Sequence, residues 1–243
     1  DYYNRLQSSQ YDKALQKLES SRFMKRNRNE LLLMLEAGRL YFLMNNPAKS
    51  NYYFNSADAL MESSRKSVKD IALGNLLNPM MQSYRGEDFE PFMVHFYKAI
   101  NYMQLGQREE AVVEARRITL SSTRQQDKVN NKSDRYGKDA FAHNVQGILY
   151  EQNNDINNAF IAYRNAADLY LDNGNEYYGV PLPDQLKQDL LRTASLMGFT
   201  DELERYEKKF QVRLKEPEKT AGGELLLFLE QGEAPTKEEQ RFF

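Results

Sequence analysis

The chain of 243 residues is 41% hydrophobic and contains 16 Tyr and 13 Phe, which is enough apolar material for a sizeable core. Its formal net charge of −2 gives no reason to expect nucleic-acid binding, and we predict none. The absence of cysteine excludes disulfides, thiolate metal sites and cysteine nucleophiles within the chain. No apolar run reaches the length of about 18 residues that a membrane-spanning helix needs.

Apolar residues recur with helical spacing over most of the chain, and turn residues mark where the helices end. Polar residues 121–137 indicate a loop, and Pro181 and Pro183 indicate an extended linker. In chain order we expect a partial helix pair over residues 2–21, then helices at about 29–44, 47–65, 67–77, 89–105, 108–120, 138–153, 156–172, 184–197 and 200–213.

The last part of the chain has a different composition. Residues 216–223 form a charged, glycine-containing linker, and the apolar run 224–230 predicts a short strand. A lone strand is not stable, so it must pair with another segment, lie in a groove or add to a partner's sheet. We therefore expect a helical domain over 1–213 and a tail over 214–243 that packs on this domain or on a partner.

One spaced pattern occurs three times: a small residue, then positions three, seven, twelve, sixteen and nineteen residues later. The small residue and the aromatic that follows lie on one helix face, where a second helix must approach closely. The third position is Gly or Asn, which tolerates the left-handed conformation that ends a helix, and Asn46 and Asp155 can cap the helices that follow. The copies are Gly38-Tyr41-Asn45-Ser50-Phe54-Ala57, Ala99-Tyr102-Gly106-Ala111-Ala115-Ile118 and Gly147-Tyr150-Asn154-Ala159-Tyr163-Ala166.

These spacings resemble the tetratricopeptide repeat (TPR) family over residues 31–58, 92–119 and 140–167. The first copy has Ser50 where Ala is usual, and the second lacks the aromatic at Ala115. The resemblance implies an all-α fold of helix hairpins stacked as a right-handed superhelix. Insertions must separate the repeats, because the copies lie further apart than the usual period of about 34 residues.

In this family the concave groove is lined by the side of each first helix that faces away from its partner helix. An open apolar groove would bind a protein or peptide partner. The alternative is that the chain fills the groove itself, with the segment 66–80 or the predicted strand 224–230. The predicted groove residues are Leu32, Leu35, Phe42, Met93, Phe96, Ile100, Met103, Phe141 and Ile148.

His95 and His143 occupy the same position in two copies, four residues before the small residue. That position packs between the helices of a pair, so we expect packing histidines rather than ligands and predict no metal or other cofactor. Glu87, Asp88 and Glu90 precede or open a helix. Capping by Asp88 and a favourable helix dipole for Glu90 explain them better than acid–base chemistry or calcium binding.

A locally basic stretch begins with Arg116, Arg117, Arg124 and Lys128. It is able to meet an acidic partner, phosphate or lipid head groups; the alternative is a solvated stretch with structural ion pairs near Glu114. The chain contains no phosphate loop, dinucleotide-binding glycines, nucleophile elbow or zinc-protease motif. We therefore predict that it is not an enzyme.

Two segments carry a narrower resemblance, to repeat-containing lipoproteins of the bacterial envelope: residues 84–90 together with 111–117, and the ending from Gly223 to Lys237. It implies a periplasmic or outer-membrane protein that touches the membrane only through an acylated cysteine upstream of Asp1; a cytoplasmic location is the alternative. We expect a non-enzymatic interaction scaffold of the envelope. An envelope receptor for a small molecule or glycan is the second hypothesis, motivated by the many tyrosines and by Tyr177 and Tyr178 in the linker.

Overall fold

The computed structural model describes residues 2–66, 83–87, 89–128, 139–215 and 227–228. These residues are predominantly helical, as the sequence predicted. A two-stranded antiparallel hairpin, β1 (Glu176–Tyr177) and β2 (Val180–Pro181), is the only sheet within them. The helices are α1 (Tyr2–Gln7), α2 (Tyr11–Ser20), the short 3-10 helix η1 (Asn27–Asn29), α3 (Glu30–Leu43), α4 (Pro47–Lys66), α6 (Glu90–Gln104), α7 (Arg108–Lys128), α8 (Ala140–Gln152), α9 (Ile156–Asp172), α10 (Asp184–Leu196) and α11 (Thr200–Phe210).

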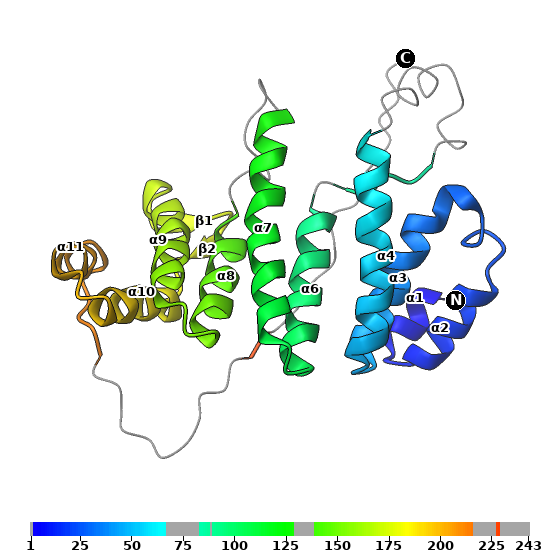
Figure 1. The fold of residues 1–243 in the computed structure, drawn as a ribbon, viewed down its shortest axis with the longest axis horizontal. Helices are drawn as coiled ribbons and strands as arrows, with labels where there is room; N and C mark the ends of the chain where they lie inside the picture. The colour runs from blue at the N-terminus through cyan, green and yellow to red at the C-terminus, as the bar shows by residue number, and fades with distance from the viewer. Residues whose placement is uncertain (1, 67–82, 88, 129–138, 216–226, 229–243) are drawn as a thin grey trace.

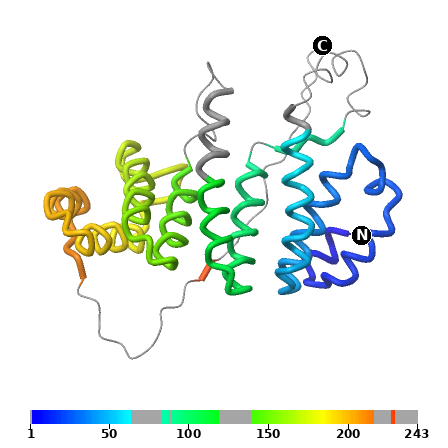
Figure 2. Tube along the Cα trace, in the orientation of Figure 1, coloured from blue at the N-terminus to red at the C-terminus, as the bar shows by residue number. Residues whose placement is uncertain are grey.

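The helices form hairpins that stand side by side in a row, from α1–α2 at one end to α10–α11 at the other (Figure 1, Figure 2). Neighbouring hairpins pack through α4 on α6, α7 on α8 and α9 on α10, and the first helices α3, α6 and α8 also touch in succession. The core follows the row as three hydrophobic clusters. This is the stacking that repeats require, because one hairpin alone leaves an apolar face uncovered. Within the described part of the chain, no helix is both long and apolar enough to cross a bilayer.

Two glycines allow the helices of their hairpins to approach closely. A Cβ added at Gly38 would lie 2.8 Å from the ring of Phe54, and one at Gly147 would lie 2.4 Å from the ring of Tyr163. Both distances are far shorter than the roughly 3.5 Å at which carbon atoms attract one another. The small residue and the residue sixteen positions later are therefore direct neighbours across the hairpin.

The turns inside the hairpins use the predicted residues. Asn45, Gly106 and Asn154 all have positive φ, at 53°, 71° and 59°. This left-handed conformation closes a helix C-terminus, and Asn and Gly adopt it at low cost. The side chains of Asn46 and Asp155 each accept a hydrogen bond from a backbone N–H in the first turn of the following helix. These predictions are confirmed.

A polar contact ties the first two complete hairpins together and explains the unusual Ser50. Its Oγ donates a hydrogen bond to the carbonyl of Gly38 at 2.9 Å and accepts one from Asn101 Nδ2 at 2.8 Å. Asn101 also donates to Asn51 Oδ1 at 2.9 Å. An alanine at position 50 would leave the buried Asn101 amide with one partner fewer, so the hydroxyl is a link between repeats.

Two predicted boundaries were wrong. Helix α7 continues to Lys128, so residues 121–128 are helical rather than loop. That segment is polar but contains neither Gly nor Pro, and polarity alone does not end a helix. Helix α11 ends at Phe210, three residues before the predicted end, and Gln211 takes the left-handed conformation with φ 54°.

The linker between α9 and α10 is not simply extended. It contains the β1–β2 hairpin, whose turn residues Tyr178 and Gly179 both have positive φ, at 50° and 80°. Two such residues are typical of the tight hairpin turn that matches strand twist. The predicted helix 67–77 lies outside the described residues. Of the predicted strand 224–230 only Leu227 and Phe228 are described, and they form no strand.

Candidate partner-binding site

The predicted groove residues lie on three first helices, and we call the surface that they form on α3, α6 and α8 the first-helix face. Phe141, on α8, joins this face through its ring, whose centroid is 5.8 Å from that of Phe96. Ile148 belongs to the neighbouring cluster that extends toward α10. Six of the predicted residues belong to one hydrophobic cluster: Leu35, Phe42, Met93, Phe96, Ile100 and Met103.

Exposure differs strongly along the first-helix face. Phe96 is 2% exposed and Ile148 is 8% exposed, so these two do not offer open surface, contrary to the prediction. Phe141 is 46% exposed. The remaining predicted residues are partly buried: Leu32, Leu35, Phe42, Met93, Ile100 and Met103. Whether the face binds a partner stays a prediction, but its accessible part centres on Phe141.

A residue of the C-terminal tail covers part of this face. The ring of Phe228 meets that of Phe96 edge to face, with centroids 5.6 Å apart and an interplanar angle of 82°. Phe228 packs against both the cluster that contains Phe96 and the cluster that contains Ile148. The chain therefore fills at least this point of the face itself.

Charged side chains are buried on the other side of α6. The ammonium of Lys98, 2% exposed, lies 3.0 Å from Glu114 Oε1 on α7 and 3.2 Å from Asp58 Oδ2 on α4. His95 Nδ1 lies 2.7 Å from Glu114 Oε2, and Arg117 Nη1 lies 2.9 Å from Asp58 Oδ2. The network joins three helices of two hairpins. We call it the inter-repeat ion network.

The network keeps Glu114 ionised despite its burial. Burial alone would raise the pKa of this carboxyl, but the hydrogen bonds from His95 and Lys98 and the charge of Lys98 outweigh it and hold the pKa below its ordinary value. His95 thus packs between the helices of its pair, as predicted. Its partner, Glu114, lies on the second helix of the same hairpin.

His143 packs in the equivalent position of the next copy without an equivalent acidic partner. Its Nδ1 is buried and has no hydrogen-bond partner within the described structure. Burial lowers the pKa of its imidazole, although Gln146 and Asp139 act in the opposite direction. Across the described residues, no three His, Asp or Glu side chains come together in a way that could hold a metal ion.

The acidic cluster before α6 has a structural arrangement. Glu90 Oε1 accepts a hydrogen bond from the Tyr84 hydroxyl at 2.7 Å, and Oε2 accepts one from the Glu87 backbone N–H at 2.7 Å. Burial nevertheless raises the pKa of Glu90 above its ordinary value. The backbone N–H of Tyr84 donates to the Arg28 carbonyl at 2.7 Å, which fastens the segment to η1. The predicted cap Asp88 lies outside the described residues.

The described part of the basic stretch, up to Lys128, lies in α7. Arg116 is exposed, and Arg117, whose side chain is 44% exposed, belongs to the inter-repeat ion network. Arg124 and Lys128 both lie in α7. The predicted ion pair with Glu114 is made by Lys98 rather than by either arginine.

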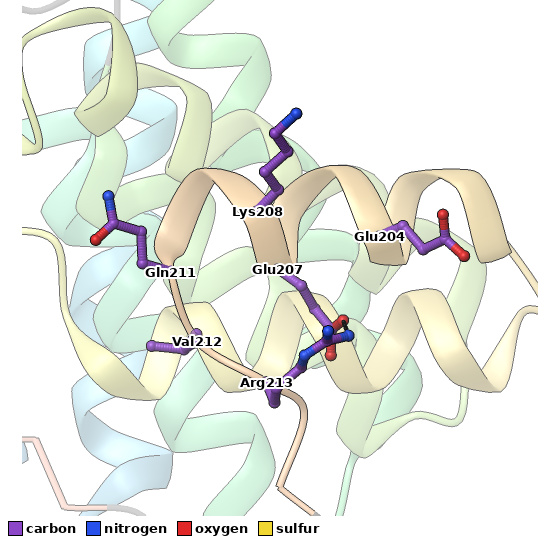
Figure 3. Close-up of a pocket in the computed structure, with 6 residues that line it drawn as sticks. All are labelled: Glu204, Glu207, Lys208, Gln211, Val212 and Arg213. Carbon is purple, nitrogen blue, oxygen red and sulfur yellow. Dashed lines mark hydrogen bonds and ion pairs between the residues drawn. The ribbon is translucent and has the colours of Figure 1, made fainter.

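A separate surface hollow lies at the far end of the row, where α11 ends (Figure 3). It is lined by polar side chains, among them Glu207, which accepts from Arg213 at 2.7 Å and from the Leu214 backbone N–H at 2.9 Å. Because these bonds hold the chain after α11 against that helix, the hollow has a structural explanation. It shares no residue with the first-helix face.

Two residues of the first-helix face were not predicted from the sequence. Phe92 stacks on Phe96 with centroids 6.2 Å apart and meets Phe141 edge to face, also at 6.2 Å. Its position four residues before Phe96 on one helix was a usable signal. Phe228 lies in the run 224–230, which the sequence offered as one of two segments to fill the groove, but Phe228 itself was not singled out.

Comparisons with known proteins identify the fold. No protein-family model matches the sequence, and no curated protein sequence matches it. Solved structures do match: a kinesin light chain-type protein of Podosopora anserina with nearly identical TPR-like repeats (TM-score 0.53, 14% identity, 86% of this chain and 90% of that chain). MamA from Desulfovibrio magneticus matches at TM-score 0.50 and 13% identity over 86% of this chain and 87% of that one. BtubC from P. vanneervenii matches at TM-score 0.50 and 16% identity, over 93% and 81%.

These likenesses extend over most of each chain, so they concern the whole row of hairpins rather than one of them. The protein therefore has an all-α fold of TPR-like helix hairpins, as its spaced sequence pattern predicted. At 13–16% identity the likeness shows the fold alone.

Proposed function

We propose that the protein is a non-enzymatic interaction scaffold of the bacterial cell envelope that binds a protein partner through the first-helix face. The fold supports a binding role, because stacked hairpins present an extended surface built from successive first helices. The narrower likeness of residues 84–90 and of the chain's ending to envelope lipoproteins supports the location.

One observation carries the proposal: Phe141 is 46% exposed while it lies among aromatic rings. An aromatic side chain that is half buried on its own helix and open on the other side gains further burial when a partner covers it. Phe92 and Phe96 support it from α6, so the ring is held in place before a partner arrives. Such pre-ordering lowers the entropy that binding loses.

Site-specific photo-crosslinking in the source bacterium tests the proposal. A benzoyl-phenylalanine replaces Phe141 in one strain and Tyr52, which is 67% exposed on α4, in a control strain. We expect one discrete protein adduct from position 141, recovered with the envelope fraction and absent from position 52. Identical adducts from both positions, or none from position 141, would contradict binding at the first-helix face. An adduct found only in the soluble cytoplasm would contradict the location.

A receptor for a small molecule or glycan is the second candidate, and one observation favours it. Tyr178 is 72% exposed at the tip of the β1–β2 hairpin, with Tyr177 against it at 4.7 Å between ring centroids. Exposed aromatic faces stack on sugar rings. A thermal-shift screen with glycans tests this: a ligand that raises Tm for the natural chain and not for Tyr178→Ala supports it.

A further inference from the structure

Leu227 and Phe228 lie against the first-helix face in the way that an extended peptide would. The Leu227 side chain is 81% exposed, whereas Phe228 is partly buried against two core clusters. Neither residue belongs to a helix or strand. Successive side chains that point to opposite sides are characteristic of an extended backbone, so a single aromatic side chain anchors this point of the tail.

The place where Phe228 lies is a junction between repeats. Its ring approaches Phe96 of α6, and it also packs against the cluster to which α8, α9 and α10 contribute. Phe141, the accessible aromatic of the first-helix face, touches the same Phe96 ring from α8. Phe228 therefore lies beside the surface where the partner is expected, because Phe228 and Phe141 contact the same Phe96 ring.

We propose that Leu227–Phe228 is a resident pseudo-ligand, and that the partner of the first-helix face is an extended apolar peptide with an aromatic anchor that displaces Phe228. The inference rests on the proposed function, and it adds the chemistry of the partner. The resident segment shows what the face accepts: an aromatic ring at the junction between repeats, preceded by an aliphatic residue that is exposed to solvent. An identical ring on another chain can make the same contacts with Phe96 and the two clusters.

Tethering sets the size of the competition. A segment tethered to its own binding site through a short stretch of chain has an effective concentration on the order of 1 mM. If a free peptide binds the vacant face with Kd of about 0.1 mM, the resident tail weakens that binding about tenfold. Removing the anchoring ring should therefore reveal a site that the natural chain partly hides.

The experiment uses the full chain and a defined probe. The probe is a fluorescein-labelled peptide with the sequence of residues 222–232, and its binding is followed by fluorescence anisotropy. We expect the Phe228→Ala chain to bind the probe about tenfold more tightly than the natural chain. Leu227→Ala is the matched control, because its side chain is exposed, and it should bind as weakly as the natural chain. A probe with Ala at the anchor position should bind neither.

Several results overturn the proposal. Equal affinity of the natural and Phe228→Ala chains means that Phe228 does not compete, and no binding to a Phe228→Ala chain of unchanged helicity means that the face takes other chemistry. A dimer of the natural chain that Phe228→Ala dissociates in sedimentation velocity places the tail on a second copy instead. If Phe228 does not compete with the probe but position 141 still gives its protein adduct, the pseudo-ligand is rejected and the proposed function stands. If Phe228 competes with the probe but position 141 gives no adduct, the proposed function is rejected and the docking of Phe228 on the face stands.

Discussion

Replacement of Gly147 by alanine gives a direct test of how the repeats are built. Gly147 lies on α8, where α9 crosses closest, and the added methyl group would fall 2.4 Å from two ring carbons of Tyr163. Tyr163 is fully buried, and its hydroxyl donates to Glu151 Oε2 at 3.0 Å. Glu151 in turn pairs with Arg192 of α10. A displaced Tyr163 ring therefore disturbs the link to the next hairpin as well.

Two opposite effects determine the size of the change. Overpacking a well-packed core costs about 1–3 kcal/mol. Alanine is a better helix former than glycine by about 1 kcal/mol, which offsets part of this loss. Because the overlap involves two carbons of a ring that has no room to move, we expect a net loss of about 1–2 kcal/mol. For a chain of this size that corresponds to a fall in Tm of about 2–8 °C.

Urea and thermal unfolding followed by circular dichroism at 222 nm measure this loss. The matched control is Tyr163→Leu, which removes the ring, and the double variant completes a cycle. In the Tyr163→Leu background, Gly147→Ala should lose its penalty and approach the gain of about 1 kcal/mol that helix propensity alone gives. A Gly147→Ala chain as stable as the natural chain, with no coupling to position 163, would refute close approach as the reason for this glycine.

Three further predictions concern the buried charge, the buried histidine and the hairpin turn. Lys98→Met should lower the free energy of unfolding by about 3 kcal/mol, because it leaves buried carboxylates without their ammonium partner. Arg117 is more exposed, so Arg117→Met should lower it by less than about 1 kcal/mol. Urea unfolding of both variants measures the two changes. Burial lowers the pKa of His143. Below the ordinary imidazole pKa of about 6.5, the unfolded chain therefore binds a proton that the folded chain does not. This proton difference lowers the free energy of unfolding as the pH falls through that value and has no effect above it. The urea midpoint of His143→Gln should therefore fall less between pH 7.5 and 5.5 than that of the natural chain, and an equal fall would contradict the effect. Tyr178→Gly should slow amide exchange in β1–β2, because glycine takes the positive φ at position 178 without the cost of about 1 kcal/mol that a side chain carries; faster exchange would mean that the ring holds the turn.

The repeats were predictable because each of their steps has a local cause. Gly38 and Gly147 are small where a helix crosses, and Asn45 and Asn154 take the left-handed turn that only a few residue types favour. These requirements act within one hairpin, over fewer than about twenty residues, so they leave a spacing that can be read from the chain. The all-α fold follows from them together with helical periodicity.

The inter-repeat ion network was not predictable by the same means. Lys98 stands beside Ala99 in a helix, and its sequence neighbours give no sign that it is buried. Its carboxylate partners lie on two other helices, and Asp58 is forty residues away in the chain. A lysine becomes buried only when both carboxylates converge on it, which depends on how hairpins stack rather than on any one of them.

The tail shows a similar limit. The sequence predicted that the apolar run 224–230 is covered by another surface, because apolar residues in a polar tail favour burial. The sequence predicted a strand that pairs, lies in the groove or adds to a partner's sheet, and it did not single out Phe228 as the residue that docks. The docking position is created by Phe96 and the α8–α10 cluster, which are brought together only when the repeats are stacked.

Helix α6 serves two purposes because its opposite sides are chemically distinct. Lys98 and Asn101 face the neighbouring helices and are buried with polar partners, so they fix how one hairpin lies on the next. Phe92 and Phe96 face the other way and contact aromatic rings, among them Phe141 and Phe228. The polar side links α6 to α4 of the preceding hairpin, and the aromatic side links α6 to α8 of the following one. The same division explains why the chain's own Phe228 can occupy that side without entering the ion network.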